Sequence, residues 1–466
     1  MIETERIRHL NDRRVTAGAG FVLYWMQAAQ RAIDNQALSH AALEADRLGL
    51  PLEVLFVLAD YPAATVPHYR WMLGGLRECS STLRDAGIGF SIVRGDPLAM
   101  VTNAAIGAAM VVCDRSPSGW SVRLRASLAA SLDIPVVEVD GESVVPEAVA
   151  SSRQEWSART FRGRISGAVD VYATTPPLPV PVPRRAAGTA GMAGDDKLFS
   201  AYDSPMAHAY SGDRSPLQSF AAVSGTSAAL VLLERFVLER LDRYDADRND
   251  PTKDGTSGLS PYLHFGQLSP VAVIRAAKTA GGPGYPAFAE QVVVRRELCR
   301  NYARWHPLDV DSWEGIPSWS RSTLEAAARD RRAYVYTRAN FEASLTHDAY
   351  WNAPQEQLVR TGTIHNYMRM YWGKMMLAWS ASPREAFETA VYLNDRYALD
   401  GRDPNGWAGV AWCFGLHDRP WPPRPVFGTV RAMAASGLRR KFDADGYAAT
   451  WAPDHLPKSA LESTIP

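Results

Sequence analysis

Short apolar runs alternate with helix-like segments along the first third of the chain. The apolar runs occupy residues 20–25, 52–59, 88–93, 109–113 and 134–139, and the segment from Asn35 to Leu48 has the spacing of a surface helix. Strands that alternate with helices at this distance form a parallel sheet with helices on both faces. The pattern therefore predicts an α/β domain over residues 18–165.

The pattern changes after residue 174. Residues 174–195 are rich in Pro and then in Ala and Gly, a composition that cannot build a packed core, so we place an interdomain linker at residues 166–223. From Ser224 onward apolar residues recur at helical spacing, over residues 228–241, 270–279, 288–305, 322–333, 354–360 and 365–379. The predicted fold is an α/β N-terminal domain with a parallel, Rossmann-like sheet, followed by an all-helical domain at residues 224–450.

The predicted sheet carries no phosphate-binding motif. Gly18-Ala-Gly20 precedes the first strand, whereas the glycines of a dinucleotide fingerprint follow it, and a Walker-type phosphate loop is missing. Open α/β sheets commonly bind ligands at the carboxyl ends of their strands, and we expect any ligand of this domain at that edge.

The composition argues against several classes of protein. Four cysteines lie far apart, so neither a disulfide framework nor a zinc or iron–sulfur site is indicated, and we predict no metal. The N-terminus is charged and polar, and no apolar run is long enough to span a bilayer. We therefore expect a cytoplasmic protein without a membrane partner.

Charge is balanced over the whole chain but not along it. The 50 basic and 50 acidic side chains give a formal net charge of zero, which taken alone argues mildly against a nucleic-acid partner. Between residues 419 and 441, however, Arg and Lys occur without any Asp or Glu. A basic surface can therefore coexist with a neutral total, although a solvated basic helix face would have the same composition.

Two segments of the predicted helical domain have the residue types of a binding site. Thr256-Ser-Gly-Leu-Ser260 offers hydroxyls and a glycine before a helix-like segment, where backbone amides can hold a phosphate, although an ordinary helix cap has the same sequence. Tyr392 to Trp407 concentrates Asp, Asn, Arg and Gly residues between aromatic ones. The second composition is typical of a catalytic pocket.

Together with residues 365–379, Trp412, Trp421 and Arg439-Arg-Lys441, these segments resemble the C-terminal flavin domain of class II cyclobutane pyrimidine dimer photolyases, in the photolyase/cryptochrome family. The resemblance extends from about residue 21 to residue 447. It implies FAD as the cofactor, in the reduced anionic form FADH⁻. The residues that match its binding segments are Tyr244, Thr256, Ser257, Gly258, Leu259 and Ser260.

The resemblance also assigns residues to the flavin ring. A flavin that works as an anion needs a cation nearby, and a neutral amide suits ring nitrogen N5 better than a carboxylate, which would repel the charge. By resemblance Asn394 contacts N5, and Arg369 and Asp400 form a salt bridge beside the ring. We expect Asn394 and Asp400 in one Asp/Asn-rich loop. The alternative is an ordinary buried ion pair that holds a helix to this loop.

Three tryptophans match the chain that carries electrons from the surface to the flavin in class II enzymes. Trp372 would lie nearest the flavin, Trp351 in the centre and Trp379 outermost. Trp372 and Trp379 are seven residues apart in a predicted helix and so share a face, about 10.5 Å apart along its axis. Aromatic residues at this spacing more often form core packing, which is the alternative.

Lesion binding is expected at the segment before Arg295-Arg-Glu297. Family members have a carboxylate there that hydrogen-bonds a thymine carbonyl, but in this chain the position falls on Gln291, with Glu290 one residue away. An amide can still donate a hydrogen bond to a carbonyl, so a reduced yield is expected rather than loss of activity. Trp412 matches the tryptophan that packs on the dimer. Candidate DNA contacts are Arg295, Arg424, Arg431, Arg439, Arg440 and Lys441.

The resemblance implies light-driven repair of cyclobutane pyrimidine dimers in UV-damaged DNA, with an electron passing from photoexcited reduced FAD to a flipped-out dimer. An antenna chromophore of the 8-hydroxy-5-deazaflavin type would bind the N-terminal domain, and we expect a monomer. Repair of (6-4) photoproducts fits less well, because it calls for paired histidines and Arg369 stands four residues after His365.

Two other functions remain open. A cryptochrome-like blue-light photosensor would keep FAD and the tryptophan chain but lack repair activity; Gln291 favours it, whereas the basic segment and a tail of only about 20 residues oppose it. A flavoenzyme that works in the dark is disfavoured, because no nicotinamide fingerprint is present.

Overall fold

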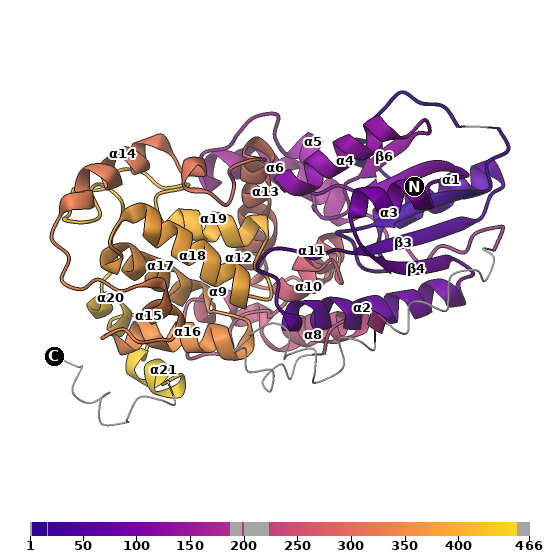
Figure 1. Ribbon diagram of the computed structural model, residues 1–466. Helices are drawn as coiled ribbons and strands as arrows, with labels where there is room; N and C mark the ends of the chain where they lie inside the picture. Colours follow the sequence, from indigo (N-terminus) through magenta and orange to yellow (C-terminus); the bar gives the residue numbers. More distant parts are fainter. Residues whose placement is uncertain (1, 16, 187–197, 200–222, 454–466) are drawn as a thin grey trace.

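The computed structural model describes residues 2–15, 17–186, 198–199 and 223–453, and places a six-stranded sheet at one end of the molecule (Figure 1). The strand order is β1-β6-β5-β2-β3-β4. The strands are β1 Ile7–His9, β2 Phe21–Met26, β3 Leu52–Leu58, β4 Gly89–Arg94, β5 Ala108–Asp114 and β6 Val136–Val139. All neighbouring pairs are parallel except β1 with β6.

Five of these strands lie at the predicted apolar runs, and β1 was not predicted. Its three residues include a single apolar side chain, so the pattern gave no strand signal. Strand β1 pairs with β6 from residues upstream of the predicted domain start at residue 18. A salt bridge of 2.6 Å between Arg8 Nε and Glu138 Oε1 adds to this pairing.

Alternate residues of the strands face two separate cores, as helices on both faces require. Val22, Tyr24 and Met26 pack with helices α1 (Gln36–Leu48) and α2 (Val66–Asp85). Leu23 and Trp25 pack with the segments of α3 (Pro97–Ala104) and α4 (Gly119–Ser131) on the other face. In Figure 1, α2 and α4 lie on opposite sides of the sheet.

The chain leaves the sheet through α5 (Glu147–Ala150) and α6 (Ala158–Ala173). Helix α6 continues past residue 166, where the linker was placed, and packs on the helical part of the molecule. Most of the predicted linker lies outside the described residues, so the domain limits stay a prediction.

The rest of the described chain is helical, which confirms the predicted fold class. The α-helices are α8 Thr226–Glu239, α9 Tyr244–Asp247, α10 Ser260–His264, α11 Pro270–Ala280, α12 Tyr285–Ala289, α13 Arg296–Trp305, α14 Ser318–Ala326, α15 Arg338–Glu342, α16 Ala349–Thr361, α17 Asn366–Trp379, α18 Pro383–Tyr397, α19 Pro404–Cys413, α20 Ala435–Arg439 and α21 Ala444–Thr450. The predicted helix over residues 288–305 is divided by a π-helical segment at Glu290–Arg295.

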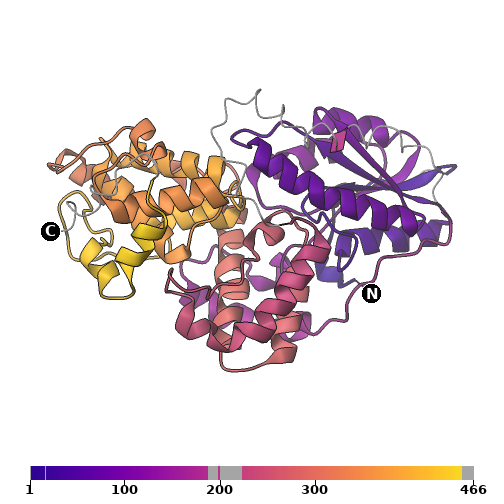
Figure 2. The same cartoon turned by 90° about the horizontal axis from the view of Figure 1, so that it is seen from below.

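The helical part is built around two hydrophobic cores. In Figure 2 the helices of the pink part of the chain and those of the orange and yellow part form two neighbouring groups. One core contains residues of α8, α11 and the π-helical segment, and it also takes in Val144 and Phe161 from the end of the α/β region. The other contains residues of α16 to α19 and α21. The first core therefore ties the helical region to the chain that leaves the sheet.

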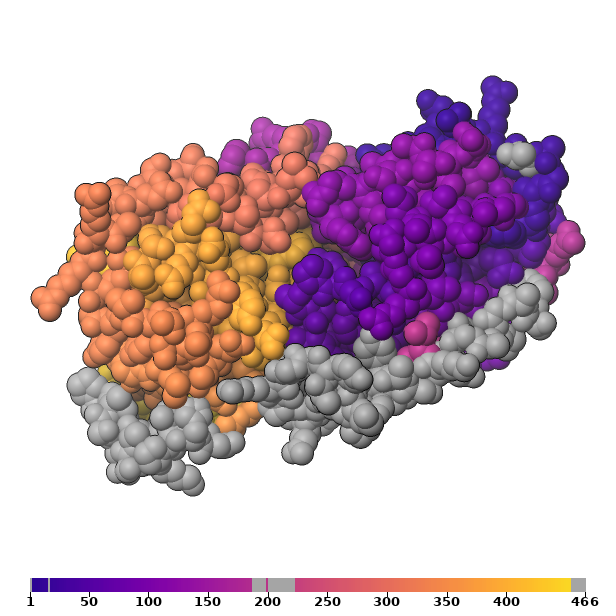
Figure 3. Space-filling model, in the orientation of Figure 1, coloured from indigo at the N-terminus to yellow at the C-terminus, as the bar shows by residue number. Residues whose placement is uncertain are grey.

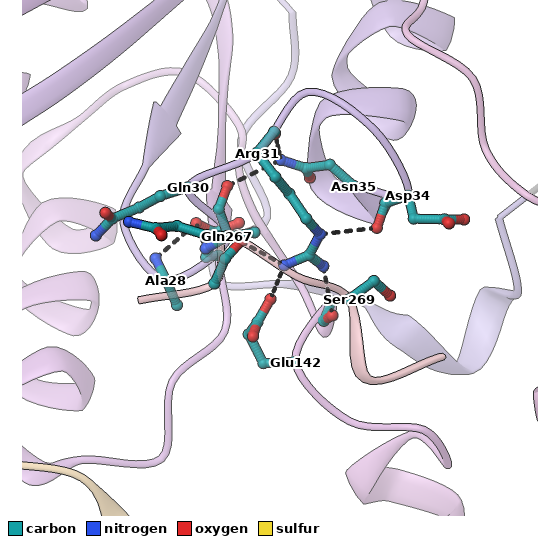
Figure 4. Close-up of polar contacts among 12 residues, drawn as sticks. Ala28, Gln30, Arg31, Asp34, Asn35, Glu142, Gln267 and Ser269 are labelled. Atoms are coloured by element: carbon teal, nitrogen blue, oxygen red, sulfur yellow. Dashed lines mark hydrogen bonds and ion pairs between the residues drawn. The ribbon is translucent and has the colours of Figure 1, made fainter. Parts of the chain in front are cut away.

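Polar contacts around Arg31 join the sheet to the helical part (Figure 4). The Arg31 guanidinium, which is 1% exposed, pairs with Glu142 at 2.5 Å and donates to the Gly266 carbonyl oxygen at 2.9 Å. Gly266 has φ +63°, and a Cβ there would lie 1.7 Å from the Ala28 carbonyl oxygen, so glycine permits this close approach. The two parts also meet along the face seen in Figure 3.

Candidate functional site

Arg369, Asn394 and Asp400 form one hydrogen-bonded cluster. Arg369, on α17, donates from Nη1 to Asn394 Oδ1 at 3.2 Å and from Nη2 to Asp400 Oδ1 at 3.4 Å. Asn394 is 2% exposed, and the side chains of Arg369 and Asp400 are 12% and 20% exposed. The structure thus brings the three predicted flavin-ring residues together, with the cation next to the amide.

Asn394 does not lie in a loop, as predicted, but in the last turn of α18. The helix continues to Tyr397, and the Ala398 backbone N–H bonds to the Asn394 carbonyl oxygen at 2.9 Å. Asn disfavours helix interiors because its side chain competes for backbone groups. Here the side chain is engaged instead by Arg369 and Asp395, which explains why the helix extends further than the pattern indicated.

Asp395 organises the segment behind this cluster. Its Oδ1 accepts from Asn394 Nδ2 and from the Arg402 backbone N–H, both at 2.9 Å, and its Oδ2 accepts from Trp407 Nε1 at 2.9 Å. Burial raises the pKa of Asp395, although these donors and the Arg402 charge oppose that shift. A Cβ on Gly406 would lie 2.8 Å from Asn394 Nδ2, so glycine leaves room for the amide.

Trp351 and Trp372 stack in the core beside the cluster. Trp351 comes from α16 and Trp372 from α17; their ring centroids are 6.4 Å apart and their planes 6° from parallel. Trp351 Nε1 donates to the Trp372 carbonyl oxygen and Trp372 Nε1 to Gln355 Oε1, both at 2.9 Å. Because both indole donors are satisfied, the pair is fixed in this orientation.

Trp379 lies at the other end of α17 and is 8% exposed, against 0% for Trp351 and 1% for Trp372. Ring contacts link Trp351 to Phe341 at 4.9 Å, Phe341 to Tyr336 at 5.8 Å, and Tyr336 to Trp379 at 6.2 Å between centroids. The structure therefore places the three tryptophans in one aromatic cluster.

The predicted phosphate segment leads into the short helix α10, of which Ser260 is the first residue. Thr256, Gly258 and Ser260 are exposed, whereas Leu259 is 1% exposed and anchors the segment in the core. His264 at the end of α10 approaches Asp403 Oδ2 through Nδ1 at 3.3 Å, which connects the segment to the start of α19.

Tyr244 is packed in the core against Phe236 and Phe288, with ring centroids 5.7 Å and 5.3 Å away. Burial raises the pKa of its phenol. The structure therefore gives Tyr244 a packing role, and a contact with FAD stays a prediction.

The residues of the Arg369 cluster fit a reduced flavin ring. A primary amide has two N–H groups, and Asp395 takes one from Asn394, so the other can be offered to a ring nitrogen. Arg369 supplies the positive charge that an anionic ring requires. The exposed hydroxyls and amides of residues 256–260 could hold a phosphate group. Arg369, Asn394 and Asp400 are therefore the residues we consider for holding the flavin ring.

Glu290 does not stand free to receive a ligand. Its carboxylate pairs with Arg162 of α6 at 2.7 Å and with Arg295 Nε at 3.1 Å. The Arg295 guanidinium lies over the Trp412 ring, 5.1 Å from its centroid. Gln291, the neighbouring candidate, is half-buried. The structure thus brings Arg295 and Trp412 together and pairs Glu290 with two arginines.

The remaining basic candidates are exposed and belong to two groups. Arg431 lies over the Trp421 ring at 4.9 Å, and Arg424 follows in the same loop region, where its backbone N–H bonds to Gly428. Arg439 and Lys441 lie over the rings of Tyr350 and Tyr367, at 6.0 Å and 4.5 Å, with Arg440 between them in the chain. The second group thus packs on the first turns of α16 and α17.

A cavity of about 230 Å³ lies at the carboxyl ends of β2 and β3, the edge where a ligand of the sheet was expected. Asp114 Oδ2 shapes one wall, because it accepts from the backbone N–H groups of Gln27, Ala28 and Ala29 at 2.7 to 2.9 Å. The lining includes Trp25, Gln27, Gln30, Tyr61, His68, Trp120, His264 and Arg402. Gln27 Oε1 and Gln30 Oε1 are buried without a hydrogen-bond partner. Amide acceptors that face a cavity in this way can bind an N–H or O–H group.

Sequence reasoning did not single out Asp395 or the cavity residues. The Asp/Asn-rich composition pointed to the segment but did not rank Asp395 within it. The residues that directly follow each apolar run were the available signal for the cavity, because Gln27 directly follows β2.

In the described part of the chain no group of three or more His, Cys, Asp or Glu side chains could hold a metal. Among the described helices, none has the length and apolar content to cross a bilayer.

The sheet region matches the family model for DNA photolyase over residues 22–183. A deoxyribodipyrimidine photo-lyase of Methanothermobacter thermautotrophicus is 41% identical over 453 residues, which cover 96% of this chain and 98% of the relative. One of Oryza sativa subsp. japonica is 38% identical, covering 92% of this chain and 87% of the relative. A photolyase from Sulfolobus tokodaii, described with two FAD molecules, superposes with a TM-score of 0.71 at 15% identity and covers 95% of this chain and 92% of its own.

The structural match supports the fold, and the sequence matches extend over almost the whole of both chains. Because these relatives share more than a third of their residues with this protein, the chain belongs to the DNA photolyase family.

Proposed function

We propose that this protein is a class II enzyme that repairs cyclobutane pyrimidine dimers in UV-damaged DNA by light-driven electron transfer from reduced FAD to a flipped-out dimer. Its relatives are named for deoxyribodipyrimidine photo-lyase activity. The observation that carries the proposal is the Arg369–Asn394–Asp400 cluster next to the stacked Trp351 and Trp372. One site then combines groups suited to an anionic flavin with an electron relay.

FAD would supply light absorption and the transferred electron, and it would be held by Arg369, Asn394 and Asp400 and by Thr256, Ser257, Gly258, Leu259 and Ser260. In this proposal Asn394 donates a hydrogen bond to the ring, and Arg369 provides a positive charge. Asp400 partly neutralises and orients Arg369, while Asp395 orients the Asn394 amide.

Trp372, Trp351 and Trp379 form the proposed relay that brings electrons from the surface. The parallel stack of the first two and the higher exposure of Trp379 support this order. Satisfied N–H groups hold the first two rings at a constant distance, which a repeated electron-transfer step requires.

The lesion would be bound by Trp412 and Gln291. Trp412 offers an aromatic face to an unstacked base, and the Gln291 amide donates to a thymine carbonyl oxygen. Glu290 holds Arg162 and Arg295, so its role in the proposal is to position these arginines. DNA phosphates would be bound by Arg295, Arg424, Arg431, Arg439, Arg440 and Lys441.

The cavity at the edge of the sheet is the proposed site of an antenna chromophore of the 8-hydroxy-5-deazaflavin type. Gln27 and Gln30 offer free amide oxygens, and Trp120 and Tyr61 form an aromatic wall with ring centroids 5.9 Å apart. The protein would act as a monomer in the cytoplasm.

The proposal is tested by anaerobic photoreduction of the FAD-loaded protein, followed by illumination with an oligothymidylate that contains cyclobutane dimers. Recovery of ultraviolet base absorbance in the light, and not in the dark, is the expected result. A matched sample of Arg369→Gln protein should lose most of this recovery. If the flavin photoreduces but the dimers persist, repair is excluded and the photosensor alternative replaces it.

A further inference from the structure

A hydrogen-bonded tyrosine–histidine pair lies against Trp379, the outermost ring of the proposed relay. The Tyr336 phenol oxygen is 2.9 Å from His347 Nδ1 and also 2.9 Å from the His347 backbone nitrogen. The Trp379 ring contacts both partners, with centroids 4.7 Å from His347 and 6.2 Å from Tyr336. The Tyr336 backbone N–H bonds to the Trp379 carbonyl oxygen at 2.8 Å, which fixes the two residues to each other.

One of these two hydrogen bonds has a fixed direction: a backbone N–H can only donate, so the phenol oxygen of Tyr336 accepts from His347 N. A neutral imidazole with its proton on Nε2 has a free lone pair on Nδ1, and in this tautomer the phenol donates its own proton to Nδ1. Proton transfer from Tyr336 to Nδ1 requires this tautomer. Burial lowers the pKa of His347, which favours the neutral imidazole, the form that has a free nitrogen to accept a proton.

We infer that Tyr336 is the terminal electron donor of the relay and that His347 accepts its phenolic proton. Oxidation makes a phenol a strong acid, so tyrosine gives up an electron readily only where a base takes its proton. An acceptor nitrogen at 2.9 Å is within the range of direct proton transfer. This inference rests on the proposed function, because it requires the photo-oxidised relay to deliver the electron vacancy to Trp379.

The step balances in charge and protons. The oxidised Trp379 radical cation takes one electron from Tyr336, while the O–H bond of Tyr336 breaks and an N–H bond forms at His347 Nδ1. The products are neutral Trp379, a neutral tyrosyl radical and an imidazolium. The Asp348 carboxylate, next in the chain, favours the charged imidazole. The positive charge would then lie on an imidazolium and no longer on an indole. Return of the electron from the flavin to the relay would therefore be less favourable.

The surroundings distinguish Tyr336 from its neighbour Tyr334. Tyr334 stacks on the same imidazole, with centroids 3.6 Å apart and planes 19° from parallel, and it is 45% exposed. The hydrogen bond to His347 Nδ1 comes from Tyr336. Tyr334→Phe is therefore a matched control, since it removes a hydroxyl next to His347 but leaves the proton acceptor and donor intact.

The test is flash-induced transient absorption of the full-length, FAD-loaded protein with oxidised flavin and no external reductant. In the unmodified protein and in Tyr334→Phe, the tryptophan radical signal should decay as a tyrosyl signal appears, more slowly in heavy water. Tyr336→Phe should abolish the tyrosyl signal. His347→Phe, which keeps an aromatic ring, should reduce its yield at least about tenfold, a loss of ~1.4 kcal/mol in the barrier difference.

The outcomes separate this inference from the proposed function. A tryptophan radical that decays without any tyrosyl signal overturns the role of Tyr336 and leaves the relay intact. A tyrosyl signal unchanged in His347→Phe overturns the role of His347. If the unmodified protein shows no tryptophan radical after the flash, the relay itself fails and the inference fails with it. Retained flavin absorbance in each variant shows that the site is folded.

Discussion

Single residues of the Arg369–Asn394–Asp400 cluster differ in the charge that they contribute. Asn394 is neutral: its Oδ1 accepts from the Arg369 cation and its Nδ2 donates to the Asp395 carboxylate. Asp400 pairs with Arg369, and the Arg402 charge lies near Asp395. Burial strengthens every charge interaction in such a site. A change of one charge at residue 394 should therefore shift the reduction potential of bound FAD more than the same change at a residue outside the cluster.

Asn394→Asp is expected to lower the reduction potential of bound FAD and to reduce repair at least about tenfold, or ~1.4 kcal/mol. The new carboxylate would repel an anionic ring and would also pair with Arg369, which withdraws the cation from the ring. The potential is measured by spectroelectrochemical titration of the loaded protein. Asn366→Asp, the same substitution at the exposed first residue of α17, is the control and should leave the potential unchanged. Equal shifts in both variants would contradict the assigned role of Asn394.

Gln291→Glu tests the position at which this chain departs from the family pattern. A protonated carboxylic acid donates a hydrogen bond to a thymine carbonyl oxygen, so the substitution restores the contact expected in the family. We expect the repair yield per absorbed photon to rise severalfold, with binding of damaged DNA little changed. The comparison variant is Glu290→Gln, which should weaken DNA binding because Arg162 and Arg295 lose their shared partner. No gain, or a loss, in Gln291→Glu would exclude a lesion contact at residue 291.

Helices of this protein begin and end where particular side chains satisfy backbone groups. The pattern predicted a helix from residue 365 to 379, and α17 begins at Asn366 because His365 Nδ1 accepts from the Tyr367 backbone N–H at 3.3 Å. His365 Nε2 donates to the Arg248 carbonyl oxygen at 3.1 Å, which ties the start of α17 to the chain after α9. The contact at Nδ1 requires a neutral imidazole, whereas Nε2–H can donate in either protonation state.

Acid is therefore expected to weaken the start of α17. Burial lowers the pKa of His365 to about 4, below its usual 6.5, so this residue contributes stability above pH ~6.5 that is lost as the pH falls toward 4. His365→Asn keeps a capping side chain but removes the titration. Urea denaturation at several pH values should show that the free energy of unfolding falls less for the variant over this pH window, by on the order of 1 kcal/mol. Parallel curves for the two proteins would rule out His365 as a source of the pH dependence.

Periodic elements were predictable from the sequence, and elements set by single contacts were not. Five strands and the longer helices follow from hydrophobic spacing, because each has a buried face of sufficient length. Strand β1 depends on pairing with β6, and the extension of α18 to Tyr397 depends on contacts of Asn394 and Asp395 with other helices. The π-helical turn at Glu290–Arg295 is likewise invisible to a 3.6-residue pattern.

At the scale of the whole molecule, buried polar contacts fix the sheet against the helical part. Arg31 and Glu142 form an ion pair in which both side chains are almost fully buried, and the His68 ring contacts the Ala398 carbonyl oxygen at 3.0 Å, directly after the helix that carries Asn394. A buried pair of this kind costs desolvation and adds little net stability, but loss of one partner is severe. These contacts therefore favour one relative placement of the cavity at the sheet edge and the Arg369–Asn394–Asp400 cluster.

The distribution of charge over the molecule predicts how binding to DNA depends on salt. The chain is neutral overall, yet residues 419–441 contain Arg and Lys without any Asp or Glu, and Arg424, Arg431 and residues 439–441 are exposed. Each phosphate contact that is lost should reduce the slope of log K against log salt by about 0.9. We expect Arg431→Gln and Arg439→Gln each to lower the slope by roughly that amount.

The measurement is fluorescence anisotropy of a dimer-containing duplex over a range of salt concentrations. Arg235→Gln is the control, because Arg235 is exposed on α8 and already paired with Glu239 at 2.9 Å. Repair measured at saturating DNA should be unchanged in all three variants, since phosphate contacts set affinity and not the chemistry at the flavin. If only Arg439→Gln lowers the slope, the bound DNA lies over the first turns of α16 and α17 and away from Trp421. Since Arg439 and Arg431 pack on different aromatic residues, the pair of slopes distinguishes these two paths across the surface.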